Sequence, residues 1–209
     1  MNRRIFIAFV ASLGFMMGAF GSANAQEAGD MAVGVDIVFT PKWVFSPYYK
    51  DGAYTNNAGV GAKFQYNVTT PIRVEGAFIY LPVGDKLGLW YLSASAQYLI
   101  PVVEKLKVYP VAGFDLMRYT VVNGAYIYID DVVLVNTKVA GKHTIFGVHF
   151  GGGAECKLSK KVSLQDELRY IIGFNNTIFS DYFKTNRLMI SLGAVYRFSA
   201  QPKPVLPNL

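Results

Sequence analysis

Histidine, serine and acidic side chains are the groups with which this chain could catalyse acyl transfer, and the sequence contains only two histidines. A hydrolase that modifies lipids would need a histidine base next to a serine nucleophile, supported by an acid. His143 is followed by Thr144 and Ile145, so no His-x-Ser motif occurs, and His149 has no serine nearby in sequence. We therefore predict no catalytic residues and interpret His149 as a buried side chain held by a hydrogen bond.

Other motifs give weak signals for cofactor or metal binding. The Gly-Val-Gly sequence at 59–61 lacks the third glycine of a dinucleotide-binding motif. Three glycines at 151–153 are better explained by close packing or curvature within a strand. Asp130 and Asp131 fit a turn better than a calcium site, and a single cysteine excludes a cysteine-based metal cluster. We therefore expect no cofactor and no metal ion.

Composition limits the class of protein. The 209 residues are 52% hydrophobic and 15% aromatic but only 16% charged, whereas about 25% is usual in soluble domains. Disordered chains are poor in aromatic residues and rich in charge, so disorder is excluded. A net charge of +6 without a block of lysine and arginine gives no support for nucleic-acid binding.

Residues 1–25 have the pattern of a secretory signal peptide. Two arginines precede an apolar run at 5–20, and Ala-Asn-Ala at 23–25 is a small-x-small cleavage site. No cysteine follows the cleavage site, so a lipoprotein is not expected. The remaining sequence has no apolar run of the 18 or so residues that a spanning helix needs. We predict export in a bacterium and a mature chain that begins at Gln26.

Alternation of apolar and polar residues is the main structural signal in the rest of the chain. In the segment 90–100 the even positions are Trp, Leu, Ala, Ala, Tyr and Ile, whereas the odd positions include Ser93, Ser95 and Gln97. A period of two over about ten residues indicates a β-strand between two different environments. Eight segments show this pattern: 31–39, 59–67, 73–80, 90–100, 107–120, 143–158, 162–174 and 187–198.

The connections between these segments favour a membrane barrel over a soluble sandwich. Segments of about ten residues suit a tilted membrane strand, whereas soluble strands typically have about five or six. Short connections at 67–71, 101–106 and 159–161 alternate with long ones at 41–58 and 121–142 and an intermediate one at 175–186, and only 82–88 breaks this order. Short periplasmic turns and longer outer loops are typical of outer-membrane barrels. We therefore predict an all-β fold, a transmembrane antiparallel up-and-down β-barrel of eight strands, with both termini in the periplasm.

Two further features fit this prediction. The alternating stretch at 125–135 has arms of about five residues, too short to span lipid, so we expect a hairpin outside the membrane or an extension of the flanking strands. Aromatic residues near the strand ends are expected to form the girdles at the two membrane surfaces. They are Trp43, Phe45, Tyr80, Trp90, Tyr98, Tyr119, Tyr170, Tyr196 and Phe198.

Parity also assigns the two faces of each strand, because a shift of one residue would exchange them. The side chains predicted to face lipid include Phe64, Phe78, Leu92, Phe114, Val148, Leu168 and Leu192. Those predicted to face the interior include Glu75, Gln97, Asp115, His149, Glu155, Glu167 and Arg169. Small interior residues such as Gly59, Gly61, Ser93, Ser95, Gly151 and Gly153 could leave gaps the size of a water molecule.

The last predicted strand carries the most specific signal. ISLGAVYRF at 190–198 ends in Phe198, with Tyr196 two residues and Gly193 five residues before it, and resembles the signal read by the barrel-assembly machinery. With NNAGVGAKFQYNVTTPIRVEGAFIY at 56–80 and FGGGAECKL at 150–158, it makes the chain similar to the eight-stranded OmpA-type and opacity-type barrels of Gram-negative bacteria. The resemblance implies a cell outer membrane location and variable extracellular loops, but no activity.

The resemblance also implies an interior packed with charge pairs and no wide channel. Gln97 and Gln165 stand where the family would be expected to carry a basic residue. Parity places five bases and four acids in the same interior: Lys63, Arg73, Arg169, Arg187 and Arg197, with Glu75, Asp115, Glu155 and Glu167. Buried charges need partners, and eight strands leave room for little except side chains. We expect this network to fill the barrel, with ion gating as the alternative.

These inferences combine into one functional prediction. Residues 26–198 form the barrel domain, and 199–209 form a proline-rich periplasmic tail. We expect a monomeric, non-enzymatic outer-membrane protein with a structural or surface-interaction role, exerted through loops at 42–57, 121–142 and 175–186. The alternatives are a small-solute or ion pore, an accessory barrel for secretion and, less favoured, a lipid-modifying enzyme. The expected partners are outer-membrane lipid and lipopolysaccharide, the barrel-assembly machinery and an extracellular ligand.

Overall fold

The computed structural model describes residues 28–41, 57–83, 87–121, 126–129, 132–135, 141–174 and 186–199. All regular structure in these ranges is β-strand, and none of them holds a helix that is long and apolar enough to cross a membrane.

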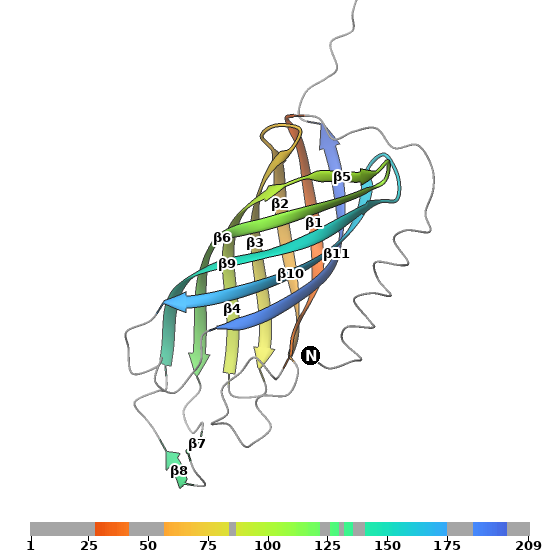
Figure 1. The fold of residues 1–209 in the computed structure, drawn as a ribbon. Helices are drawn as coiled ribbons and strands as arrows, with labels where there is room; N and C mark the ends of the chain where they lie inside the picture. The colour runs from red at the N-terminus through yellow and green to blue at the C-terminus, as the bar shows by residue number, and fades with distance from the viewer. Residues whose placement is uncertain are drawn as a thin grey trace, which may run out of the picture.

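The main sheet is a closed antiparallel barrel (Figure 1). Its first four strands are β1 (Asp30–Thr40), β2 (Asn57–Asn67), β3 (Ile72–Val83) and β4 (Leu87–Tyr98), and β5 (Ile100–Val103) continues β4 after Leu99. The other four are β6 (Leu106–Val121), β9 (Gly141–Lys157), β10 (Val162–Phe174) and β11 (Arg187–Ser199). Each strand pairs with the next, and β11 pairs with β1, so the predicted eight-stranded barrel is confirmed.

The remaining two strands lie outside this sheet. β7 (Tyr126–Ile129) and β8 (Val132–Val135) pair only with each other. The alternating stretch at 125–135 therefore forms a separate hairpin and adds no strand to the barrel. This agrees with the first of the two expectations for it and excludes an extension of the flanking strands.

The barrel has two different ends. The short connections at 68–71, 104–105 and 158–161 lie at the end where β1 begins and β11 finishes, which we call the turn end. The long connections leave from the opposite end, which we call the loop end. Two bounds differ from the prediction: β5 extends the fourth strand to Val103, and the connection between β3 and β4 is 84–86 where 82–88 is predicted.

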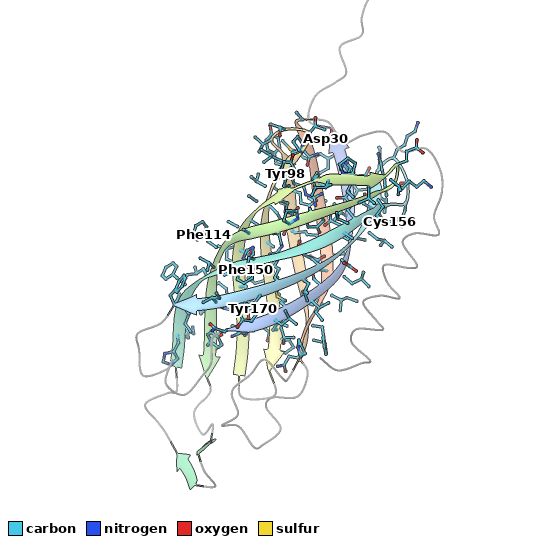
Figure 2. The ribbon with its side chains drawn as sticks, viewed as in Figure 1. Asp30, Tyr98, Phe114, Phe150, Cys156 and Tyr170 are labelled. Atoms are coloured by element: carbon cyan, nitrogen blue, oxygen red, sulfur yellow. The ribbon has the colours of Figure 1, made fainter. Side chains whose placement is uncertain are left out.

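The two faces of the strands follow the predicted parity. Phe114 is 72% exposed on the outer surface, whereas the next residue, Asp115, is 3% exposed (Figure 2). All seven side chains predicted to face the interior are buried. Of the seven predicted to face lipid, five are 46–72% exposed, and Val148 and Leu168 are partly exposed.

Two groups of residues depart from this simple pattern. Tyr119, predicted in an aromatic girdle, faces inward and is 4% exposed. Trp43 and Phe45 lie outside the described residues, whereas Tyr80, Tyr98, Tyr196 and Phe198 are exposed. Near the turn end, the outward-parity side chains of Leu106, Ala154 and Cys156 are buried and form a small cluster with Val108 and Leu164.

The core lies inside the barrel and has two kinds of layer. Towards the loop end the buried side chains are mainly apolar: Val38, Ile79, Leu81, Leu89, Met117, Ile145, Ile171 and Met189. From the middle to the turn end they are mainly polar or charged, which makes this part of the interior the candidate site.

Candidate functional site

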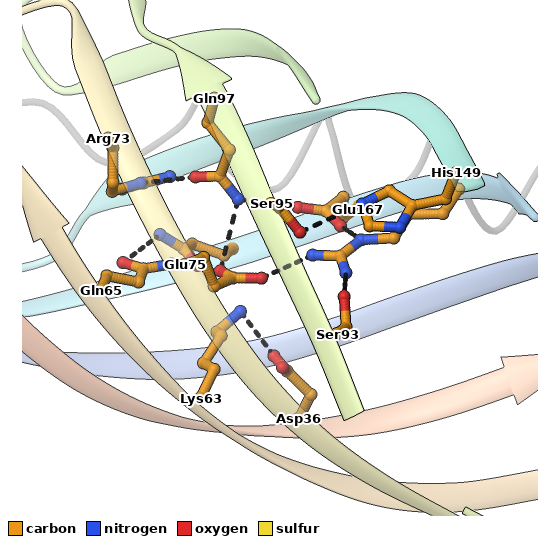
Figure 3. A network of polar contacts seen from close by, with 12 residues as sticks. Asp36, Lys63, Gln65, Arg73, Glu75, Ser93, Ser95, Gln97, His149 and Glu167 are labelled. Carbon is orange, nitrogen blue, oxygen red and sulfur yellow. Dashed lines mark hydrogen bonds and ion pairs between the residues drawn. The ribbon is translucent and has the colours of Figure 1, made fainter. Parts of the chain in front are cut away.

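Arg169 connects two carboxylates in the middle of the barrel. Its Nη2 lies 2.5 Å from Oε1 of Glu75 on β3. Its Nε donates to Glu167, which lies on β10 with Arg169 itself. Its Nη1 donates to Ser93 Oγ at 3.1 Å. Because all four residues are buried, these contacts satisfy charges that water does not reach (Figure 3).

Glu155 is the centre of a second cluster, nearer the turn end. It accepts from Arg73 Nη1 at 2.5 Å, from Arg197 Nη2 at 2.7 Å and from Gln165 Nε2 at 2.9 Å. The guanidinium of Arg73 also lies 5.0 Å from the centre of the Tyr109 ring. One carboxylate with two guanidinium partners leaves an excess of positive charge in this layer.

Glutamines join the two clusters. Gln97 accepts from Arg73 Nε at 2.5 Å and donates to Glu75 and Glu167, each at 3.3 Å. Gln65 donates to Glu75 at 2.7 Å and to Gln165 at 3.0 Å. The positions at which the sequence departs from the expected basic residues are thus neutral bridges between charged groups (Figure 3).

A third ion pair involves an acid that the sequence analysis missed. Lys63 Nζ lies 2.8 Å from Asp36 Oδ1. Asp36 has the inward parity of its strand, which is the signal that could have identified it. Gly193 of the predicted assembly signal lies directly beside this pair, since a Cβ built on it would be 1.9 Å from Asp36 Oδ1. Packing against Asp36 therefore requires a glycine at position 193, independently of any recognition by the barrel-assembly machinery.

Asp115 lies in the interior as predicted, but its partner is His149. Nδ1 of His149 is 2.8 Å from Asp115 Oδ2, and Nε2 is 3.0 Å from Ser95 Oγ. The interpretation of His149 as a buried, hydrogen-bonded side chain is confirmed. The order serine, histidine, acid is also that of serine hydrolases, but Ser95 is only 7% exposed. Ser95 and His149 are 54 residues apart in the sequence, so no local motif predicts their contact.

Arg187 is buried, as predicted, but lies in the apolar layer near the loop end. Its guanidinium carbon is 5.3 Å from the centres of both the Tyr91 and Tyr119 rings. The two aromatic faces stabilise the cation. Arg187 therefore lies between aromatic side chains near the loop end, at a different level from Arg169.

Interior glycines are covered by large neighbours. A Cβ on Gly59 would meet the Leu81 side chain at 2.7 Å, and one on Gly153 would meet the Tyr109 ring at 2.6 Å. Gly113 lies equally close to the His149 ring. The water-sized gaps expected at Gly59 and Gly153 are thus occupied by side chains from adjacent strands.

The other sequence-based site predictions have simpler outcomes. Tyr196 and Phe198 are 46% and 38% exposed on the outer surface, and their reading by an assembly machinery stays a prediction. Among the described residues, no group of three or more His, Cys, Asp or Glu side chains is arranged to hold a metal ion.

The comparisons with known proteins agree with this geometry. No curated sequence matches. Neisserial surface protein A is 18% identical, with a TM-score of 0.57 over 81% of this chain and 99% of that structure. OprG from Pseudomonas aeruginosa is 14% identical, with a TM-score of 0.54 over 84% and 99% of the two chains. Residues 7–198 match the family described as outer membrane protein beta-barrel domain, and the chain therefore belongs to this family.

Proposed function

We propose that this chain is a non-enzymatic outer-membrane barrel whose interior is closed to solutes and whose role is exerted through the connections at its loop end. The observation that carries the proposal is the contact of Arg169 with Glu75 across the middle of the barrel. A side chain that reaches the opposite wall leaves no continuous path beside it, given that eight strands enclose little more than their own side chains.

Two further layers support closure. Glu155 with Arg73 and Arg197 fills the turn-end part of the interior, and Arg187 with its two tyrosines fills part of the loop end. An ion crossing the barrel would have to displace all three layers. Because a buried charge that loses its partner is costly, steady conductance is not expected.

The surface role rests on the composition of the connections. Residues 42–56, 84–86, 122–140 and 175–185 together hold five lysines and five aspartates, and the first of these ranges also holds two phenylalanine or tryptophan and three tyrosine residues. The attachment invasion locus protein of Yersinia pestis, a structure 15% identical to this chain with a TM-score of 0.53, has been solved in complex with the heparin analogue sucrose octasulfate. Balanced charge in this chain favours contact through aromatic side chains over binding of such a polyanion.

Two measurements test the proposal. The purified intact chain is placed in planar bilayers, where no large, stable conductance is expected. A variant in which 123–140 is replaced by a short glycine-serine linker is then compared with the intact chain for binding to cell surfaces. Barrel folding of both is checked by heat-dependent gel mobility. Loss of binding is the expected result.

Each alternative has its own signature. Large, stable conductance of the intact chain would overturn the closed interior and favour the pore. Unchanged binding after the deletion would move the interaction to 42–57. Replacing Trp43, Phe45 and Tyr48 by serine tests that range. Binding that survives both changes would refute a role for these two connections.

A further inference from the structure

Charge is distributed unevenly between the ends of the barrel. The described residues at the turn end, 28–33, 66–73, 97–107, 155–163 and 196–199, hold seven basic and three acidic side chains. Two of these bases, Arg73 and Arg197, form ion pairs with Glu155 inside the barrel. Of the other bases, Lys160 and Lys161 are exposed, and Lys105 and Lys157 are partly exposed on the adjacent turn and strand end. We call these four residues the lysine patch.

The backbone brings the lysine patch together on two adjacent turns. The amide of Lys157 donates to the carbonyl of Lys105 at 2.9 Å, which joins the β5–β6 turn to the end of β9. The amide of Arg197 donates to the carbonyl of Lys161 at 2.7 Å, which fixes the β9–β10 turn against β11. Both turns project at the upper right of Figure 2, beyond Cys156.

The turn that carries Lys160 and Lys161 is also held rigidly. The amides of Lys161 and Val162 donate to Ser159 Oγ at 3.3 and 3.1 Å, and the Ser159 amide donates to the Val162 carbonyl at 3.0 Å. The lysines therefore start from a fixed backbone, which lowers the entropic cost of holding a ligand.

The side chains next to the patch face lipid. Lys161 Nζ lies 5.8 Å from the centre of the Tyr196 ring, and Tyr196 is 46% exposed on the outer surface. Leu158, Val102 and Val103 are 48%, 54% and 53% exposed beside the same turns. A lysine beside an exposed aromatic ring and next to exposed apolar side chains is typical of the level of lipid headgroups. This position favours a membrane lipid over a ligand inside the barrel.

We propose that the lysine patch binds the phosphate headgroups of anionic phospholipids in the leaflet that surrounds the turn end. In outer-membrane barrels the short turns face the periplasm, so this is the periplasmic leaflet. Asp30 and Glu104 at the same end reduce the net charge but leave it positive. Lysines near an anionic surface attract its lipids, and salt screens the attraction.

The experiment measures which lipids lie next to the barrel. The full chain is reconstituted in vesicles of phosphatidylcholine with one-fifth phosphatidylglycerol, and electron spin resonance of spin-labelled lipids gives the relative affinity of the two headgroups. We expect a preference for phosphatidylglycerol of roughly two-fold or more, because several lysines act together. It should fall towards equality in about 1 M salt, where the Debye length is about 3 Å.

Charge-removal variants decide whether the patch is responsible. K105Q/K157Q/K160Q/K161Q should lose the preference, and K160Q/K161Q, confined to an exposed turn, should lose part of it even if the fourfold variant does not fold. R118Q/K142Q is the matched control, because it removes two exterior charges near the loop end, one of them stacked on Trp90. The proposal is overturned if the intact chain shows no preference, if K160Q/K161Q retains all of it, or if the control loses as much.

Discussion

Arg169 on β10 and Glu75 on β3 meet at 2.5 Å although their strands lie opposite each other in the barrel, with three strands between them on either side. Few side chains other than arginine could make this contact, because it needs both length and several donors. The same guanidinium also holds Glu167 and Ser93. One residue therefore connects three strands, and removing it disturbs the whole central layer.

Replacing Arg169 by methionine should lower the free energy of unfolding by about 3–5 kcal/mol, since Glu75 and Glu167 would remain buried without their cation. Urea titration in lipid vesicles, followed by tryptophan fluorescence, measures the change. The triple variant R169M/E75Q/E167Q removes the stranded charges and should recover much of the loss. Equal destabilisation in both variants would mean that packing, not charge, dominates at this position.

The outer face gives a second prediction. Leu192 is 48% exposed on the lipid-facing surface, and an arginine there should cost about 2–4 kcal/mol if it lies at the middle of the bilayer. Val102 is also exposed, but lies next to the turn end. An arginine at Val102 should cost about 1 kcal/mol or less, as expected near a membrane surface. The same urea titration compares the two variants, and an equal cost would contradict the assigned membrane depth.

Alternation alone was enough to predict which side chains enter the barrel. Every member of the predicted charge network, including Arg187, is buried as parity requires. Parity could not predict their partners, because contacts across the interior depend on strand stagger and side-chain length. Parity therefore groups Asp115 with the arginines although it binds His149, and a strand dominated by apolar residues hides the role of Asp36.

The same limit explains why Ser95 was not connected with His149. Parity places both residues in the interior, but a sequence motif links a histidine only with a serine close to it in the chain. Contacts between strands far apart in the chain follow from register, and β4 reaches β9 only across β6. The lipid-facing residues needed no such information, since each is defined by its own strand.

The serine–histidine–acid contact gives a third prediction, which separates a structural from a chemical role. Ser95→Ala should cost about 1 kcal/mol, the loss of one buried hydrogen bond. His149→Ala should cost more, about 3 kcal/mol, since it leaves Asp115 buried without a partner. A fluorophosphonate probe should not label the folded chain. Labelling that disappears in Ser95→Ala would contradict the structural role and favour the alternative of a lipid-modifying enzyme.

The fourth prediction concerns Gly193, where packing and assembly make different demands. A Cβ at this position would lie 1.9 Å from Asp36 Oδ1 and 2.4 Å from the carbonyl oxygen of Val35, and the backbone carbonyl cannot move aside easily. Gly193→Ala should therefore lower the free energy of unfolding by about 1–3 kcal/mol, as overpacking usually does.

Gly76→Ala is the matched control, because a Cβ on Gly76 would meet no atom within 4 Å. It should leave stability unchanged or raise it by up to about 1 kcal/mol. Both variants are refolded in vesicles without any assembly machinery, so that only packing is measured. Equal stability of the two would mean that the glycine serves recognition during assembly and not the fit of Asp36 against β11.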